Sequence, residues 1–524
     1  MPVIARLRSR LASPRGQDGF TLLIAIGVLF VTGLLLLAAF TAVQGDAKIS
    51  HATVVQQQAY YAALSGVQEY EYKLEVNADY WEACESLASK EESGERYEVS
   101  LLAASGKSLS SCATNPYETI IESSGAEANT FRIKVTGCAG KSGLTSCPSK
   151  SEGTVEVKTL VATFRVSGFL NYVYFTQFED IDPSLLSGDP HGCEEYYRER
   201  GADSECEIGF AAADSVSGPL HTDDAAKVQC TKSLTFGRKE HSPADVVEIN
   251  GGTHPTCTSP NEPIYYTESK TYSKGAELVP PASDGSLEAY AEAEDVLEGV
   301  NELVLKGTTI EDYHWVGSWS EKTLAWPKNG LIYDKNSTTE TCHYVYKATE
   351  NDSLTTARLN EERPCATTYV DGTYSKSLTI GSQENIVILN NIDPTGITLG
   401  AAPTGNATLG LIATDFVRVY HPVGENESSA VPEFYIYAAI LSTSHSFLVD
   451  QWTSGTVDKY LNVYGAIAQK FRGPVATANE TSVTSGFTKR YTYDQRLATE
   501  EPPYFLSPLS SGWEVSRLTA PTAG

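Results

Sequence analysis

Clustered carboxylates and two histidines are the side chains of this sequence best suited to chemistry. Carboxylates gather in Glu179-Asp180-Ile181-Asp182 and in Asp223-Asp224, and hard oxygen ligands of this kind bind Ca²⁺. Solvated acidic turns are the commoner role of such stretches, and we favour that interpretation here. His221 and His445 lie in strand-like surroundings, which favours packed or surface histidines over general bases.

Known catalytic and cofactor motifs are missing from the sequence. Gly106-Lys107-Ser108 and Gly140-Lys141-Ser142 do not complete a phosphate-binding loop, because Leu101 and Val135 stand where that loop needs its first Gly. The sequence contains no His-Glu-x-x-His, no Gly-x-Ser-x-Gly and no EF-hand loop. We therefore expect a protein that is not an enzyme and that holds no metal and no cofactor.

The charge of the chain argues against nucleic acid as a partner. The formal net charge is −27 at pH 7, and a chain this acidic does not follow a phosphate backbone through bulk charge. Lys239, Lys470, Arg472, Lys489 and Arg490 come closest to basic clusters. They are typical of a solvated face.

The cysteines indicate an oxidising compartment. There are ten, an even number. The sequence contains neither a Cys-x-x-Cys motif nor a Cys-His spacing typical of zinc sites. In an exported domain they predict up to five local disulfides, with nearest-neighbour pairing as our hypothesis, although a sequence does not establish connectivity. The candidates are Cys84, Cys112, Cys138, Cys147, Cys193, Cys206, Cys230, Cys257, Cys342 and Cys365.

An uncharged, mostly apolar run near the N-terminus predicts a transmembrane helix. Phe20–Val43 spans 24 residues, about 36 Å of helix at 1.5 Å per residue, against a hydrocarbon core of roughly 30 Å. Arg6, Arg8, Arg10 and Arg15 precede it, so the positive-inside rule places the leader in the cytoplasm and the rest outside. A secretory signal peptide and an uncleaved signal anchor are the alternatives.

The segment that follows keeps helical spacing. Between Asp46 and Asn77 there is no Pro, so nothing forces a break. Apolar or small residues recur every three or four positions, which predicts one long helix whose second half is amphipathic. These residues are Val55, Ala59, Ala62, Ala63, Val67, Tyr70 and Leu74.

The basic leader, the Gly19-Phe20-Thr21-Leu22-Leu23-Ile24 junction and the long helix together resemble a type IV prepilin. The stretch from Gln58 to Val67, QAYYAALSGV, is similar to PilX-type minor pilins. The resemblance covers about the first 80 residues. It implies cleavage after Gly19 by a prepilin peptidase, leaving Phe20 as a methylated N-terminus. Major pilins carry Glu at the fifth mature position, where this chain has Ile24, and this difference points to a minor pilin or pseudopilin.

The remainder of the chain reads as mainly β. Residues 129–137 and 153–178 alternate apolar and polar side chains, as half-buried strands do. From about residue 216, short apolar runs recur between Gly, Asn and Asp turns, and Thr231–Gly237 is echoed by Ser375–Gly381. Repeated runs of this kind predict a parallel β-solenoid, with a β-sandwich as the alternative.

These observations predict an α+β fold, with a long N-terminal transmembrane and spine helix followed by a mainly β ectodomain. The predicted divisions are a leader at 1–19, the helix at 20–78, a pilin-like β head at 79–178, a disulfide-rich linker at 179–215 and a β-solenoid-like domain at 216–524.

The predicted function is that of a minor pilin or pseudopilin with a structural or tip-adhesion role. The expected partners are a prepilin peptidase, other pilin subunits and the cytoplasmic membrane. The expected location is a single-pass cytoplasmic membrane protein with an exported C-terminal domain, at the cell surface or in a pilus after processing. A permanently anchored solenoid surface protein is the main alternative, and an exported polysaccharide-active enzyme is a weaker one.

Overall fold

The computed structural model describes residues 18–77, 79–121, 130–140, 142–166, 168–186, 193–197, 206–212, 214–346, 355–423, 433–455, 457–479, 482–498, 500–509 and 513–520. All but the last two residues of the predicted leader therefore lie outside the described residues.

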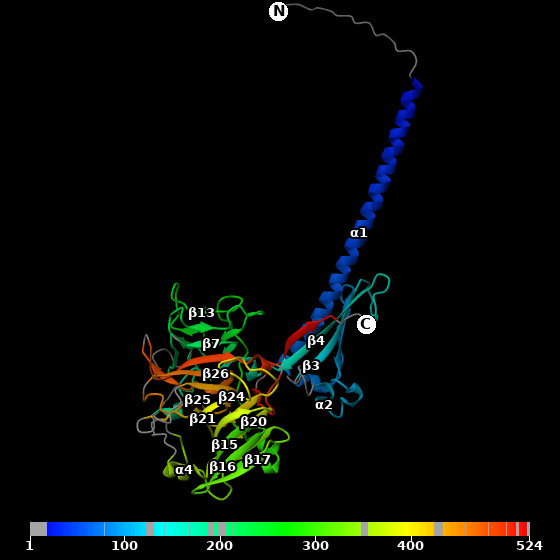
Figure 1. The fold of residues 1–524 in the computed structure, drawn as a ribbon. Helices are drawn as coiled ribbons and strands as arrows, with labels where there is room; N and C mark the ends of the chain where they lie inside the picture. Colours follow the sequence, from blue (N-terminus) through cyan, green and yellow to red (C-terminus); the bar gives the residue numbers. More distant parts are fainter. Residues whose placement is uncertain are drawn as a thin grey trace, which may run out of the picture.

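One long helix, α1, begins the described chain. It runs from Asp18 to Val76, 59 residues, and only its C-terminal part lies against a sheet, while the rest extends away from the molecule (Figure 1). The residues that face the sheet are buried and recur at helical spacing, as expected for an amphipathic helix. They are Val55, Ala59, Ala62, Ala63, Val67, Tyr70 and Leu74.

The prediction of a transmembrane helix is wrong. A membrane span needs about 20 consecutive, predominantly apolar residues, and among the described residues no helix is long and apolar enough to supply them. The predicted single-pass membrane location is contradicted by the same finding.

The predicted α+β class is also corrected, because the molecule is mostly β. The α-helices of the described residues are α1, α2 (Pro116–Ile120) and α4 (Thr356–Glu362), and α2 and α4 have five and seven residues. The prediction overestimated the share of helix in the fold, because it relied on one long helix. It missed many of the strands, several of which have only two or three residues. The short 3₁₀ turns are η1 (Tyr80–Ala83), η2 (Leu109–Ser111), η3 (Phe169–Asn171), η4 (Pro183–Leu185), η5 (Gly285–Ala289), η6 (Ala293–Asp295) and η8 (Gln495–Ala498).

A five-stranded antiparallel sheet forms the head against which α1 packs. In spatial order its strands are β1 (Leu87–Ala88), β2 (Glu95–Leu102), β3 (Thr130–Ala139), β4 (Glu156–Val166) and β29 (Trp513–Thr519). The helix approaches β3 so closely that a Cβ at Gly137 would lie 2.2 Å from the Ala59 carbonyl oxygen. Only glycine allows this contact between helix and strand.

Aromatic rings fill the space between α1 and the sheet. Phe131 and Phe164 stack with ring centroids 5.0 Å apart, and the Trp513 ring meets Phe131 edge-on at 4.7 Å. Tyr70 of α1 and Trp81 pack on the same cluster. Because Trp513 belongs to β29, the C-terminal strand completes the core of the head.

The second domain is a stack of parallel coils with two long ladders. The first ladder contains β14 (Val296–Glu298), β18 (Leu331–Lys335), β20 (Leu378–Ser382), β22 (Leu409–Ala413), β24 (Phe434–Ser442), β26 (Val457–Phe471), β5 (Tyr174–Phe178), β8 (Leu220–Thr222) and β11 (Val247–Ile249). The second contains β15 (Val300–Gly307), β19 (Thr367–Tyr374), β21 (Asn385–Pro394), β24, β26, β28 (Val483–Tyr493), β7 (Ser215–Ser217), β10 (Thr235–Phe236) and β13 (Ile264–Tyr265). Every pair within these ladders is parallel, which is the topology of a β-solenoid.

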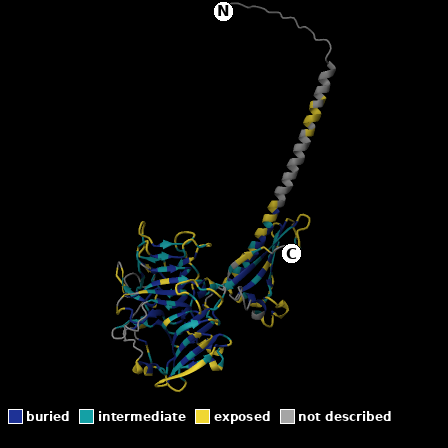
Figure 2. Ribbon diagram, in the orientation of Figure 1, coloured by how far each residue is buried: buried dark blue, intermediate teal, exposed yellow. Residues whose placement is uncertain are grey.

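Shorter strands flank the two ladders. β23 (Val417–Val419) and β25 (Phe447–Val449) extend from β21, and β6 (Gly209–Phe210), β9 (Ala226–Val228) and β12 (Thr253–His254) form a small parallel sheet. β16 (Thr309–Trp315) and β17 (Trp319–Ala325) add antiparallel strands beyond β15, and β27 (Ala476–Ala478) pairs antiparallel with β28. Figure 2 shows that β17 is exposed, whereas the interior of the coils is buried.

The order of the coils in space is not the order of the chain. The chain enters the stack in the middle, at β5, and its next coils extend to one end of the stack, at β13. It then crosses to the other end, at β14. The later coils return toward the middle, where β26 pairs with β5 and β28 pairs with β7. In Figure 1 the green strands β13 and β15 accordingly lie at opposite ends of the stack, with the orange β26 between them. The solenoid is thus inserted between β4 and β29 of the head, and β5, which lies before residue 179, already belongs to the solenoid.

A covering segment between β13 and β14 runs along the outside of the first ladder. The backbone N–H of Leu278 donates to Asp223, and the Asp284 carboxylate accepts from the hydroxyls of Thr414 and Tyr333. Leu278 and Leu287 are buried against outward-facing apolar residues of the ladder. This segment therefore covers strands that would otherwise expose apolar surface.

Two buried ion pairs mark the seam where the last coil meets the first. Arg472 Nη1 lies 2.6 Å from Glu179 Oε2, and the Arg472 guanidinium lies 3.7 Å from the centroid of the Phe210 ring. Lys489 Nζ lies 2.9 Å from Asp214 Oδ2. The backbone N–H of Arg472 also donates to the carbonyl oxygens of Phe178 and Asp180. Each pair joins a residue from the C-terminal part of the chain to one more than 250 positions earlier.

We expect Arg472→Met to destabilise the protein strongly, because it leaves the Glu179 carboxylate buried without its cation. Removing one partner of a buried pair costs about 3–5 kcal/mol, measured here as the free energy of unfolding in urea. The exposed Lys328, which pairs with Glu292 and Glu294 at the surface, is the control, and Lys328→Met should cost no more than about 1 kcal/mol. Equal losses in the two variants would contradict a role for this pair in closing the seam.

Candidate assembly surface and buried polar clusters

The face of α1 that points away from the sheet carries an apolar stripe. Val54, Tyr61, Tyr72 and Val76 expose 49, 61, 63 and 70% of their surface. Their spacings of seven, eleven and four residues place them on one side of a helix with 3.6 residues per turn. An exposed apolar stripe is typical of a protein–protein contact. Leu29, Phe30 and Leu34, farther along the helix, are also exposed.

The residues predicted to be processed lie in the first turns of α1. Gly19, Phe20 and Ile24 are helical, and their side chains lie outside the described residues. The predicted disulfide cysteines all lie beyond the C-terminal end of α1 in the chain. Cleavage, methylation and the effect of the missing Glu at Ile24 stay predictions.

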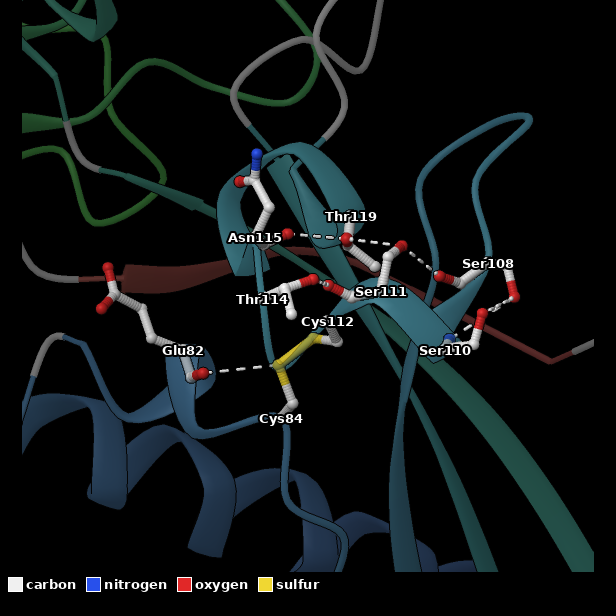
Figure 3. Close-up of a disulfide and its surroundings, with 9 residues drawn as sticks. All are labelled: Glu82, Cys84, Ser108, Ser110, Ser111, Cys112, Thr114, Asn115 and Thr119. Carbon is white, nitrogen blue, oxygen red and sulfur yellow. Dashed lines mark hydrogen bonds between the residues drawn. A yellow bond between two sulfur atoms is a disulfide. The ribbon is translucent and has the colours of Figure 1, made fainter.

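The ten cysteines form five disulfides between successive cysteines. The pairs are Cys84–Cys112, Cys138–Cys147, Cys193–Cys206, Cys230–Cys257 and Cys342–Cys365. Figure 3 shows the first of them linking the end of η1 to η2, beside hydrogen bonds among Ser111, Asn115 and Thr119. Each bridge closes a short loop, so the disulfides hold local loops and do not join the two domains.

Several carboxylates of the two predicted clusters accept hydrogen bonds from protein donors. Glu179 accepts from Tyr174, Thr176 and Arg472. Asp224 accepts backbone N–H groups from Glu179, Tyr197 and Ala225, and Asp182 accepts from Ser184 and His445. Within the described ranges no group of three or more His, Cys, Asp or Glu residues is arranged to hold a metal ion.

His221 is enclosed between two carboxylates. Its Nδ1 lies 2.8 Å from Glu248 Oε2 and its Nε2 2.8 Å from Asp223 Oδ1, and Tyr172 donates to the same Glu248 oxygen at 2.9 Å. Burial acts to lower the pKa of His221, but the hydrogen bonds and charges of Asp223 and Glu248 outweigh it and raise that pKa. The imidazole is fully buried, and each of its two ring nitrogens lies within hydrogen-bonding distance of a carboxylate.

His445 has a similar but more open setting. Its Nδ1 lies 2.8 Å from Asp182 Oδ2, its Nε2 lies 3.7 Å from Asp415 Oδ1, and its ring stacks on Phe416 at 4.6 Å. Burial acts to lower the pKa of His445, whereas Asp182 and Asp415 raise it more. The partners Glu248 and Asp415 were not identified from the sequence. Glu248 pairs with His221 in the register of β11 on β8. Knowledge of that register would have identified Glu248 as a partner.

Buried carboxyl groups along the first ladder have raised pKa values. Burial raises the pKa of Asp334 to about 8, although hydrogen bonds from Thr368 and Asn301 act in the opposite direction. Burial likewise raises the pKa values of Asp284 and Asp415 to about 7. These groups are neutral over part of the range in which exposed carboxyls are ionised.

In the described structure a long helix packs on an antiparallel sheet, and a solenoid is inserted in the chain between two adjacent strands of that sheet, β4 and β29. No protein-family model and no curated protein matches the sequence. Among solved structures, the competence-associated pilin ComZ from Thermus thermophilus aligns with a TM-score of 0.29 and 12% identity, covering 89% of this chain and 97% of that one. The chain is similar to that pilin only distantly.

Stability should fall as the pH rises from 5 to 9, and Asp334→Asn should reduce this fall. A carboxyl whose folded pKa is raised stabilises the fold fully below its unfolded pKa of about 3.9, and that contribution is lost as the pH rises through the folded value. For Asp334 the folded value is about 8. The amide cannot ionise, so the melting temperature of the variant relative to that of the unmodified protein should rise from pH 5 to pH 9.

Melting temperatures measured at intervals from pH 5 to 9 provide the test. The exposed Glu268→Gln serves as the matched control for the loss of one carboxyl. Parallel curves for Asp334→Asn and the unmodified protein would contradict the assigned titration.

Proposed function

We propose that the protein is a minor pilin or pseudopilin of a type IV pilus-like system, with a structural role after its leader is removed. The observation that carries the proposal is the division of α1 into two parts. Its C-terminal part packs across the head sheet, and its remaining length extends beyond the head (Figure 1), where Leu29, Phe30 and Leu34 are exposed.

The exposed apolar residues of α1 need a partner. Leu29 and Phe30 expose 71 and 68% of their surface, and Tyr61 and Tyr72 expose 61 and 63% of theirs beside the head. Burying a large apolar side chain contributes about 1.5–3 kcal/mol, so helices of other pilin subunits packed against this surface would be strongly stabilised. The other subunits are therefore the proposed partners.

Two features favour a minor or tip position over the repeating shaft. Major pilins carry Glu at the position that Ile24 occupies in this chain. This subunit therefore offers no carboxylate there to a neighbour's N-terminal amine. The inserted solenoid, stacked from β13 to β17, is bulky beside the head (Figure 1). A bulky domain at the end of a filament avoids clashes that would recur at every shaft position.

The proposed role is structural or adhesive and is not enzymatic. The two histidines that could act as bases are held between carboxylates, and His221 is fully buried. A general base must reach the proton that it removes, and the fully buried His221 imidazole does not. The solenoid would therefore present a binding surface.

Processing after Gly19 is the first prediction from this proposal. Mass spectrometry of the protein made with a prepilin peptidase should find a methylated N-terminus at Phe20, and without the peptidase the N-terminus should remain Met1. Gly19→Val should leave the leader attached, because a branched side chain then occupies the cleaved junction. Retention of Met1 in the unmodified protein with the peptidase would contradict the pilin pathway.

Assembly through the exposed stripe is the second prediction. Tyr61→Asp combined with Tyr72→Asp should reduce incorporation into filaments at least about tenfold, because two aromatic contacts are lost and two charges would be buried. The measurement is the amount of protein in sheared filaments relative to the total. Gln56→Asp, also exposed on α1, is the control and should incorporate normally. Normal incorporation of the double variant would contradict assembly through this face.

A further inference from the structure

A cavity of about 390 Å³ lies at the seam of the solenoid. Its walls come from β6, β9 and the β27–β28 hairpin, so it is built from the two parts of the chain that meet when the last coil pairs with the first. Val475 and Val483 contribute apolar walls, and four ionisable residues also line it: Glu207, Asp214, Lys227 and Lys489. A concave site with apolar walls and a few placed polar groups is typical of small-molecule binding.

The charges that line the cavity already balance one another. Lys489 Nζ lies 2.9 Å from Asp214 Oδ2, and Lys227 Nζ lies 2.9 Å from Glu207 Oε2. The two cations and two anions therefore form two pairs. A charged ligand would add an uncompensated charge to this partly buried site, which is costly. A neutral ligand adds none.

Hydrogen-bonding capacity nevertheless remains at the walls. Glu207 Oε1 is buried and has no hydrogen-bond partner among the described residues, and the Glu207 side chain is only 4% exposed. The Lys489 ammonium carries three donors, of which the described contacts use one, toward Asp214. Glu207 and Lys489 both line the cavity, so the unused acceptor and the unused donors belong to side chains that border it.

Hydroxyl groups meet both needs at once, because each donates one hydrogen bond and accepts others. Apolar walls suit the C–H faces of a sugar ring, and ligand sites range from about 300 to 1,000 Å³, so this cavity is at the small end. We propose that it binds a single neutral, pyranose-sized polyhydroxylated ligand, such as one hexose unit of a glycan. The inference does not depend on the proposed filament role.

The test is a binding measurement on the full chain with methyl β-D-glucopyranoside, methyl β-D-galactopyranoside and D-glucuronate as probes. Saturation-transfer NMR and a titration should detect at least one neutral glycoside, and glucuronate should bind at least tenfold more weakly. Absence of binding by both neutral probes, or tighter binding of glucuronate, would overturn the proposal.

Two variants place the binding in this cavity. Ala478→Trp fills the exposed rim without touching the ion pairs, and Lys489→Met removes the ammonium donor. Each should weaken binding of the neutral glycoside at least tenfold. Ser320→Trp, on the exposed strand β17, is the matched control and should bind normally. Since Lys489→Met leaves Asp214 buried without its cation and could unfold the chain, Ala478→Trp decides, and unchanged binding in that variant would overturn the assignment.

Discussion

The pairing of the last solenoid coil with the first is the constraint on which the rest of the structure depends. Parallel hydrogen bonds join β26 to β5 and β28 to β7, and the buried pairs Arg472–Glu179 and Lys489–Asp214 lie at the same level. Buried ion pairs contribute little net stability, because desolvation offsets their attraction. Their effect here is on register, since a slip of either ladder by one residue would separate one of these pairs and leave its two charges buried without partners.

Closure of the seam also explains how the two domains share one chain. The chain enters the stack from β4 and leaves it toward β29, and both points lie near the middle of the stack. β29 can therefore return to the head and pair with β4. Trp513 then packs into the aromatic core under α1. A solenoid built in simple chain order would release its C-terminus at one end of the stack, far from β4. Loss of the seam would therefore also remove a strand from the sheet that supports α1.

The sequence patterns predicted where single strands lie better than they predicted which strands pair with one another. Alternation between residues 129 and 178 indicated strands, and β3 and β4 lie there, while the echo between Thr231–Gly237 and Ser375–Gly381 falls on β10 and β20. Neither pattern shows which coil stacks on which, because each apolar run fits any parallel neighbour equally well. The return of β29 to the head was equally invisible, and so was the cavity, whose lining residues Glu207 and Lys489 are far apart in sequence. The transmembrane prediction was wrong, because among the described residues no helix is long and apolar enough to cross a membrane.

Stacked coils create sites from residues that are distant in sequence, and the clusters at His221 and at the seam differ in the hydrogen-bonding capacity that they leave unused. At His221, the register of β8 on β11 sets Glu248 beside the imidazole, and Asp223 closes the other side, so both ring nitrogens are occupied in a buried environment. At the seam, each cation has one carboxylate, while Glu207 Oε1 has no partner among the residues described. A fully satisfied cluster can only hold the fold together. A balanced cluster with unused hydrogen-bonding capacity beside a cavity can also hold a neutral ligand, and that difference assigns structure to the first and binding to the second.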